Sequence, residues 1–160
     1  MKKIYLIGIS GSGKSTICEE FIKANPEYVR LNRDAIREAL IPNHNDIWYT
    51  ASYTGQRQIN EGLISKLLSS IEGNNKFVID DNTNLNEKFL TQDFKKNKHR
   101  DLEVWVVMDS FDLSLCTERD LNRDRTVGKK IIEKQYNSFI SLINNLSLLK
   151  EEFNLTIKEV

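Results

Sequence analysis

Apolar residues along this chain fall into short runs that alternate with longer amphipathic segments. Between the runs, apolar residues recur every three or four positions, as in a helix with one buried face. The short runs predict strands at Ile4–Gly8, Tyr28–Leu31, Phe77–Asp80, Leu102–Met108 and Phe153–Lys158. The amphipathic segments predict helices at Lys14–Ala24, about Asn32–Leu40 (with Asn32 as N-cap), Ser52–Ile71, Asn86–Lys96, about Phe111–Asn122 and Lys129–Leu149.

This alternation predicts an α/β fold, with a central parallel sheet of about five strands and helices on both faces. In the helix expected at Ser52–Ile71, the apolar residues Ile59, Leu63, Leu67 and Ile71 follow one another at steps of four. Ligands of such folds bind at the carboxyl ends of the strands. We therefore expect the functional residues directly after the strands.

The totals are those of one ordinary globular domain, which we expect to span residues 1–160. Lys plus Arg and Asp plus Glu both number 23, so a polyanionic partner would be held at a few points and not by overall charge. Cys18 and Cys116 are interpreted as free thiols in a reducing compartment. The apolar run after Met-Lys-Lys is too short for a signal peptide or a membrane span, so we expect a cytoplasmic protein with no membrane association.

The strongest motif is a phosphate-binding loop. Residues 8–15 read Gly-Ile-Ser-Gly-Ser-Gly-Lys-Ser, which fits G-x-x-x-x-G-K-S between a predicted strand and a predicted helix. Glycines let backbone N–H groups turn toward phosphate oxygens, and the helix N-terminus adds a positive field. Lys14 is expected to reach the β- and γ-phosphates of ATP, Ser15 to ligate Mg²⁺, and Thr16 to support the helix start or touch the α-phosphate. The donor site predicted from this motif comprises Gly8, Ser10, Gly11, Ser12, Gly13, Lys14, Ser15 and Thr16.

The second strand is followed by Asn32-Arg33-Asp34, with Arg37 one turn later. At the start of a helix, Asp34 and Arg37 would share a face beside the phosphate-binding loop. Asp34 suits the acceptance of a proton from a hydroxyl group, and the planar fork of Arg37 suits an acceptor phosphate. The competing interpretation is a first-turn aspartate favoured by the helix dipole, with Arg37 as its solvated partner.

The third strand ends in five short polar residues, Asp80-Asp81-Asn82-Thr83-Asn84. An acidic side chain here can hold a water bound to Mg²⁺. Either Asp80 or Asp81 could do so, and the sequence does not choose between them. A turn rich in Asn and Asp before the helix at Asn86 is the alternative.

A basic segment near residue 120 is a candidate lid. Arg119, Arg123 and Arg125 precede Thr126-Val127-Gly128, which favours a loop. An arginine over the γ-phosphate would stabilise negative charge in the transition state. The alternative is a helix surface with ion pairs.

Other polar and aromatic residues are given structural interpretations. The basic run at residues 95–100 is expected to be a solvated helix end. His44 and His99 lack the spacing of metal ligands, and Trp48 and Trp105 are expected in the core.

Four motifs in this order resemble the kinase domain of phage-type polynucleotide 5′-hydroxyl kinases: the loop at residues 8–15, Leu-Asn-Arg-Asp-x-x-Arg at residues 31–37, Asp-Asn-Thr-Asn-Leu-Asn at residues 81–86, and Arg-x-x-x-Arg at residues 119–123. The resemblance extends from Met1 to about Tyr136. The phage enzyme continues into a phosphatase domain with an Asp-x-Asp motif, which these 160 residues do not include. The sequence therefore corresponds either to a stand-alone kinase or to one excised from a longer chain.

The resemblance implies a role for each matching residue. Asp34 would be the general base toward a nucleic-acid 5′-hydroxyl, and Arg37 would contact the phosphate on its 3′ side. Arg123 would contact the β- and γ-phosphates of the donor. The donor contacts would include Arg119, Arg123 and Arg125, and the acceptor contacts Asp34, Arg37, Asp81, Asn82 and Thr83.

The function predicted from these observations is transfer of the ATP γ-phosphate to the 5′ end of DNA or RNA, with Mg²⁺, in the repair of broken ends. A homo-oligomer is compatible with the sequence. The first alternative is a small-molecule kinase acting on a nucleoside, a sugar acid or an antibiotic, which would have no need of Arg37 for a neutral acceptor. The second is a nucleotide-dependent switch protein, which would have no need of Asp34 as a base.

Overall fold

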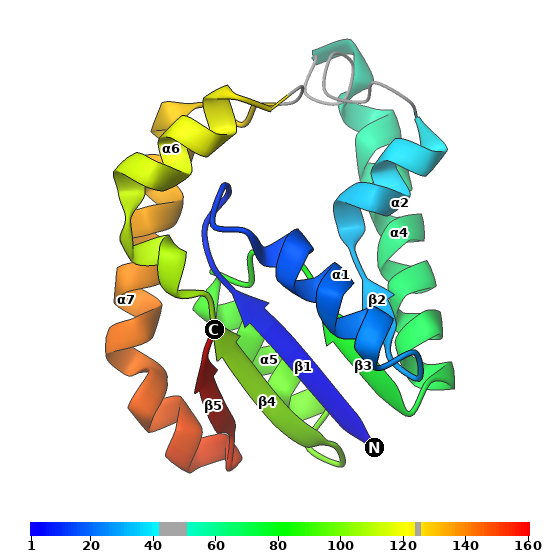
Figure 1. Ribbon diagram of the computed structural model, residues 1–160. Helices are drawn as coiled ribbons and strands as arrows, with labels where there is room; N and C mark the ends of the chain where they lie inside the picture. Colours follow the sequence, from blue (N-terminus) through cyan, green and yellow to red (C-terminus); the bar gives the residue numbers. More distant parts are fainter. Residues whose placement is uncertain (42–50, 124–125) are drawn as a thin grey trace.

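The computed structural model describes residues 1–41, 51–123 and 126–160. Five parallel strands form one sheet in the order β2-β3-β1-β4-β5. The strands are β1 Lys2–Ile7, β2 Val29–Leu31, β3 Phe77–Asp80, β4 Asp101–Val106 and β5 Thr156–Glu159. The predicted α/β fold and its five strands are confirmed. In Figure 1 the loop after β1 rises between α6 on one side and α2 on the other.

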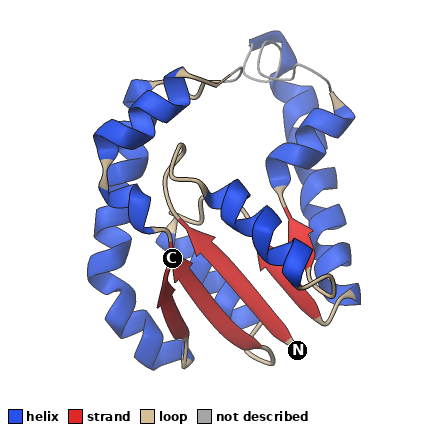
Figure 2. Ribbon diagram, viewed as in Figure 1, coloured by secondary structure: helices blue, strands red, loops and turns tan. Residues whose placement is uncertain are grey.

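Helices cover both faces of the sheet, and strand alternation explains how. Ile4 and Leu6 of β1 point to the face packed by α1 (Lys14–Ala24), together with Cys18 and Trp105. Tyr5 and Ile7 point to the opposite face, which is covered by α5 (Glu87–Lys96) and α7 (Lys129–Phe153). Figure 2 shows the sheet between these helices. Burial on both faces accounts for the continuous apolar run in the sequence of β1.

The remaining helices of the described residues are α2 (Arg33–Leu40), α4 (Thr54–Asn74) and α6 (Leu113–Leu121), with short 3₁₀ turns at Ala51–Tyr53 and Met108–Phe111. The predicted N-cap at Asn32 is confirmed, since its Oδ1 accepts a hydrogen bond from the Ala35 N–H at 2.8 Å. Several boundaries differ from expectation by a few residues. Phe153 does not begin the last strand: α7 continues past the predicted end at Leu149 to Phe153 and stops at Asn154, which has left-handed backbone angles, so β5 begins only at Thr156. The fourth strand stops at Val106 because the 3₁₀ turn follows, and Asp112 caps α6 at Leu113, two residues after the predicted start.

The apolar series on α4 is helical but not buried. Ile59, Leu63 and Leu67 are 59%, 55% and 47% exposed, whereas Ile64 is buried. Leu63 and Leu67 line a pocket of about 290 Å³ between α4 and α2. The spacing of four correctly predicts a helix, but which side of the helix is covered depends on the position of its neighbours.

The basic run at residues 95–100 is not simply a solvated helix end, and that expectation is wrong for Arg100. Its side chain is buried and donates hydrogen bonds to the carbonyl oxygens of Glu72, Asn75 and Lys76 at 2.7–3.2 Å. The orphan carbonyls at the end of α4 require such donors.

Several smaller expectations have a structural outcome. Cys18 and Cys116 are buried and free, and Trp105 lies in the core, as predicted. His44 and Trp48 lie outside the described residues. Among the residues that the structure describes, no helix combines the length and apolar character needed to cross a membrane.

Candidate active site

The phosphate-binding loop joins β1 to α1 and depends on glycine at two positions. Gly11 has φ +85° and Gly13 has φ +91°, a region that L-residues with side chains rarely adopt. A Cβ on Gly11 would also come within 2.2 Å of the Cys116 carbonyl oxygen. The backbone therefore turns here in a way that only glycine permits, as the motif predicted.

Two side chains of this loop converge on one carbonyl oxygen. The Lys14 Nζ and the Ser12 hydroxyl both donate to the Ile9 carbonyl, at 2.6 and 2.9 Å. Burial lowers the pKa of Lys14 to about 8, while the charge of Asp81 raises it and that of Arg123 lowers it further. The backbone N–H of Ser12 donates to the same carbonyl at 3.3 Å, so Ser12 stabilises the shape of the loop from inside the protein.

One pocket of about 370 Å³, called the donor pocket from here on, brings together residues from all four predicted motifs. It opens at the carboxyl ends of the strands, where the α/β architecture predicts ligands. Four cationic side chains and two carboxylates line it, so the site is locally positive although the chain is neutral. The lining residues are Ser10, Gly11, Gly13, Lys14, Ser15, Asn32, Arg33, Asp34, Arg37, Asp81, Asn82, Thr83 and Arg123.

Asp34 and Arg37 meet on α2, as their spacing predicted. Arg37 Nη1 lies 2.5 Å from Asp34 Oδ1. On its other side, Arg37 donates to Glu61 Oε1 of α4 through Nε at 2.8 Å and Nη2 at 2.6 Å. Glu61 Oε2 in turn pairs with Arg33 Nη1 at 2.8 Å. Arg37 is thus held between two carboxylates, with its side chain 17% exposed.

The two aspartates after β3 lie in different surroundings. Asp81 lines the pocket with Lys14 and Ser15. Asp80 borders a second pocket and accepts hydrogen bonds from Asn82 and Asn84. Burial raises the pKa of Asp80, against the opposing effect of Lys3. Asp80 therefore shapes the loop that carries Asn82 and Thr83 into the donor pocket, and only Asp81 adjoins Lys14 there.

The arginines of the predicted lid also lie in different surroundings. Arg123 follows the end of α6 and lines the pocket. Arg119 pairs with Asp109 at 2.7 Å and donates to the Gly11 carbonyl at 3.4 Å. Arg125 lies outside the described residues. Buried Asp120 accepts hydrogen bonds from the N–H groups of Val127 and Gly128 at 3.0–3.1 Å, and so ties the two residues before α7 to α6.

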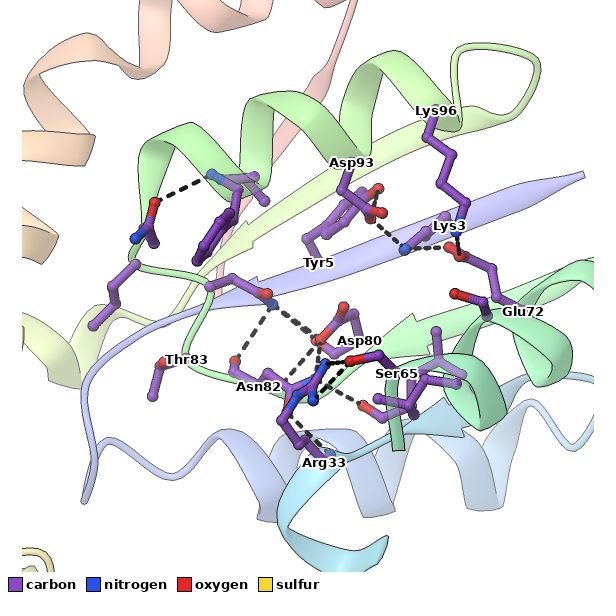
Figure 3. A pocket seen from close by; sticks show the side chains of 18 residues that line it. Lys3, Tyr5, Arg33, Ser65, Glu72, Asp80, Asn82, Thr83, Asp93 and Lys96 are labelled. Atoms are coloured by element: carbon purple, nitrogen blue, oxygen red, sulfur yellow. Dashed lines mark hydrogen bonds and ion pairs between the residues drawn. The ribbon is translucent and has the colours of Figure 1, made fainter. Parts of the chain in front are cut away.

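A second pocket, of about 520 Å³, lies between α4 and α5 and contains a buried charge network (Figure 3). Lys3 of β1 pairs with Glu72 of α4 and with Asp93 of α5, the latter at 2.5 Å. Tyr5 donates to Asp93 at 2.8 Å, and Lys96 binds Glu72 at 3.0 Å. These contacts fasten both helices to the central strand. The pocket shares Arg33, Asn82 and Thr83 with the donor pocket.

Of the predicted site residues, Gly8, Ser12, Thr16, Asp80 and Arg119 do not line the donor pocket. Sequence reasoning missed Glu61, Arg30 and Gln135. Gln135 Oε1 of α7 accepts from the Ser10 N–H at 2.7 Å. No local motif marks these three side chains, because each acts across more than twenty residues of sequence. Glu61 sits within an ordinary polar stretch of α4, and only the packing of α4 against α2 reveals its contacts.

The site contains oxygen atoms suited to Mg²⁺. Asp81 Oδ1 is buried and, among the described residues, has no hydrogen-bond partner. Ser15 is exposed and lines the same pocket. Hydroxyl, carboxylate and water oxygens are the ligands that Mg²⁺ prefers. The residues present therefore fit the ion that the phosphate-binding motif implies.

Comparisons with protein families and with curated proteins both find similar sequences. A family model described as an AAA domain matches residues 4–143. A protein of Autographa californica nuclear polyhedrosis virus, named as a putative bifunctional polynucleotide kinase/RNA ligase, is 28% identical over 151 residues. This alignment covers 88% of the chain but 21% of that protein, so the chain spans about a fifth of its relative's length.

Solved structures resemble the chain in fold. A chain of the Pnkp1/Rnl/Hen1 RNA repair complex has a TM-score of 0.69 and 20% identity, over 90% of this chain and 45% of that one. Deoxyadenosine kinase from M. mycoides has a TM-score of 0.61 and 18% identity, over 97% and 89%. A gluconokinase from Sinorhizobium meliloti 1021 has a TM-score of 0.55 and 17% identity, over 99% and 82%. At these identities the likeness establishes the fold alone.

Proposed function

The chain belongs to the AAA-domain family, and within that family we propose that it is an ATP-dependent kinase acting on the 5′-hydroxyl end of a nucleic acid. The observation that carries the proposal is the donor pocket, where Lys14, Asp34, Arg37 and Arg123 line one cavity. The viral relative named as a polynucleotide kinase/RNA ligase supports the same substrate class.

The donor half of the pocket suits the phosphates of ATP. The N–H groups of the glycine loop and the start of α1 provide donors and a positive field, and Lys14 adds a full charge. Arg123, from the segment that follows α6, lines the same pocket. Charge on the transferring phosphoryl group would then be stabilised by two cations, which is the main catalytic requirement of this chemistry.

The acceptor half suits an alcohol with a phosphate nearby. The acceptor oxygen attacks the γ-phosphorus as the bond to the β–γ bridging oxygen breaks, and ADP leaves. The hydroxyl proton passes to the carboxylate of Asp34, which is 56% exposed and therefore accessible. Arg37, held by Asp34 and Glu61, offers its guanidinium to the phosphate on the 3′ side of the reacting nucleotide.

Mg²⁺ would be held by the Ser15 hydroxyl and, through water, by Asp81. When bound, the ion neutralises charge on the β- and γ-phosphates. Asp81 suits this role better than Asp80, since Asp81 borders the donor pocket and has a buried oxygen without a hydrogen-bond partner among the described residues.

Three further features belong to the proposal. We expect the residues 1–160 to form a single kinase domain in the cytoplasm, where ATP is supplied. Repair of broken ends would be its setting, because nucleic-acid ligation needs a 5′-phosphate. Arg119 would act on the donor indirectly, since it contacts the Gly11 carbonyl and Asp109.

The direct test is transfer of labelled phosphate from ATP to an oligonucleotide with a 5′-hydroxyl. The matched control is the same oligonucleotide carrying a 5′-phosphate, which should accept nothing. DNA and RNA versions should be run side by side. If neither the DNA nor the RNA 5′-hydroxyl oligonucleotide accepts phosphate while nucleosides or sugar acids do so rapidly, the small-molecule kinase is favoured. The deoxyadenosine kinase and the gluconokinase with similar folds are of that kind.

The acceptor role of Arg37 has a sharper test, which compares a nucleoside with its 3′-monophosphate. The wild-type enzyme should prefer the 3′-monophosphate, and Arg37→Ala should abolish that preference while changing nucleoside phosphorylation far less. Exposed Lys66 of α4 gives a control: Lys66→Gln removes one positive charge away from the pocket and should preserve the preference. A preference that survives Arg37→Ala would exclude this contact and weaken the polynucleotide assignment.

The salt dependence provides a second measure of the same contact. Each phosphate neutralised on a single strand adds roughly 0.7 to the slope of log affinity against log salt. An enzyme that holds one to three phosphates at an end should show a slope of about 0.7–2. Arg37→Ala should lower the slope by roughly 0.7, the contribution of one phosphate contact, because the locally positive pocket loses the guanidinium that faces the acceptor.

A further inference from the structure

Arg30 of β2 makes a set of contacts that the proposed chemistry does not yet use. Its Nε donates to Asp81 Oδ2 at 2.9 Å, and its Nη2 pairs with the same oxygen. Its Nη1 reaches Glu19 Oε1 of α1 at 3.2 Å. Asn32 Nδ2 donates to Asp81 Oδ2 as well, at 2.9 Å. One oxygen of the Asp81 carboxylate is thus occupied by three donors from the neighbouring strand and the residue after it.

The other oxygen of Asp81 is in the opposite situation. Oδ1 is buried and has no hydrogen-bond partner in the described part of the chain. The Asp81 side chain is 1% exposed and lines the donor pocket beside Lys14 and Ser15. A buried carboxylate oxygen is costly unless a donor reaches it. The donor that suits this position is a water molecule bound to Mg²⁺.

Arg30 also determines where the Asp81 charge is directed. Lys14 lines the same pocket, yet its Nζ binds the Ile9 carbonyl at 2.6 Å while Arg30 takes the Asp81 carboxylate. Asp81 exerts the largest charge effect on Lys14, one of the four cations of the pocket. Without Arg30, the buried carboxylate could pair directly with Lys14, which would draw both groups away from their ligands. The β2–β3 pairing that brings Arg30 to Asp81 is visible in Figure 1.

We propose that Arg30 is a positioning residue for Mg²⁺: it fixes the Asp81 carboxylate so that Oδ1 receives a metal-bound water, and it keeps Asp81 from pairing with Lys14. This inference rests on the proposed function only for the use of ATP and Mg²⁺, and is independent of the acceptor. Partners that orient metal ligands in this way typically contribute 10- to 100-fold to metal affinity.

The test measures ATP binding by calorimetry without any acceptor, once in EDTA and once across a Mg²⁺ series. Arg30→Gln should raise the Mg²⁺ concentration needed for half-maximal enhancement of ATP binding by about tenfold, while ATP affinity in EDTA changes by less than about twofold. Glu19→Gln is the matched control, since it removes only the outer partner of Arg30, and it should behave as wild type. Arg30→Lys keeps the charge but loses the fork, and should give an intermediate shift.

Two outcomes would overturn the proposal: an unchanged Mg²⁺ requirement, or an equal loss of ATP affinity with and without Mg²⁺, which would indicate a purely structural role. Circular dichroism and the thermal midpoint establish that each variant is folded. If Arg30→Gln does not fold, the intermediate shift expected for Arg30→Lys carries the test. Because no nucleic acid is used, failure to phosphorylate oligonucleotides would leave this result unaffected.

Discussion

Replacing Glu61 with Gln tests how the acceptor site is assembled from two helices. Glu61 of α4 is a single carboxylate that binds two guanidinium groups of α2: Oε1 accepts from Arg37 and Oε2 from Arg33. Glutamine keeps the length of the side chain and one acceptor oxygen, but it removes the charge. The substitution therefore weakens the attachment of Arg37 without opening a cavity.

The size of the effect follows from these contacts. A hydrogen bond to a charged group contributes about 1.5–3 kcal/mol and a neutral one about 1 kcal/mol. Two arginines lose the charged partner, but Glu61 is 29% exposed, so solvent screens part of the loss. We expect the free energy that holds Arg37 in its orientation to fall by about 1–2 kcal/mol. This corresponds to a rise of about 5- to 30-fold in the Michaelis constant for a 5′-hydroxyl oligonucleotide.

The opposite expectation is that Glu61 competes with the acceptor phosphate, in which case its removal would strengthen acceptor binding. We expect orientation to dominate, because Arg37 freed from Glu61 still has Asp34 2.5 Å away and would turn toward it. The assay is steady-state kinetics with the oligonucleotide and ATP varied separately. The Michaelis constant for ATP should be unchanged, and Lys66→Gln on the same helix should match wild type. A lower Michaelis constant for the oligonucleotide would refute the reasoning.

Three other substitutions have definite expected results. Lys14→Ala should reduce phosphoryl transfer by at least about a hundredfold, since the transferring phosphoryl group loses its buried cation; near-normal turnover in a phosphate-transfer assay would exclude this role. Asp34→Asn should lower the rate about 10²- to 10⁴-fold with little change in ATP affinity by calorimetry, whereas an equal loss of ATP affinity would indicate a metal or structural group. Burial raises the pKa of Glu72, but Lys3 and Lys96 outweigh it and hold the pKa below the usual value for a glutamate. A carboxylate whose pKa is lower in the folded state than in the unfolded state stabilises the fold. This stability is fully present above the unfolded-state pKa and is lost as the pH falls through the folded-state pKa. Glu72→Gln should therefore cost about 3 kcal/mol in urea unfolding near neutral pH and flatten the decline of stability at pH values below the usual pKa of a glutamate; an unchanged acid profile would contradict this.

The order of strands and helices could be predicted from the sequence because each element carries its own periodic signal. A buried strand reads as a short apolar run, and a helix repeats at three or four residues. Capping also acts locally, so Asn32 could be placed at the start of α2 from its neighbours alone. Boundaries such as that of α6 were less accurate, since the 3₁₀ turn at Met108–Phe111 has no comparable signal.

The phosphate-binding loop was predictable for the same reason. Its function depends on backbone geometry within eight consecutive residues, and the positive φ of Gly11 and Gly13 is a conformation that glycine adopts without steric cost. The pairing of Asp34 with Arg37 was also within reach, because a three-residue separation on a helix places side chains together.

The tertiary structure decided everything that depends on which surfaces meet. Only the packing of α4 against α2 gives Arg37 its second carboxylate, Glu61, and only the pairing of β2 with β3 brings Arg30 to Asp81. Asp80 and Asp81 are adjacent and chemically identical, but successive residues leave a strand toward opposite sides, so one borders the donor pocket and the other the buried network of Lys3. Local sequence determined which chemical groups the site contains, since dihedral preferences and periodicity act over a few residues. The partner of each group was decided by long-range packing, which no short segment encodes.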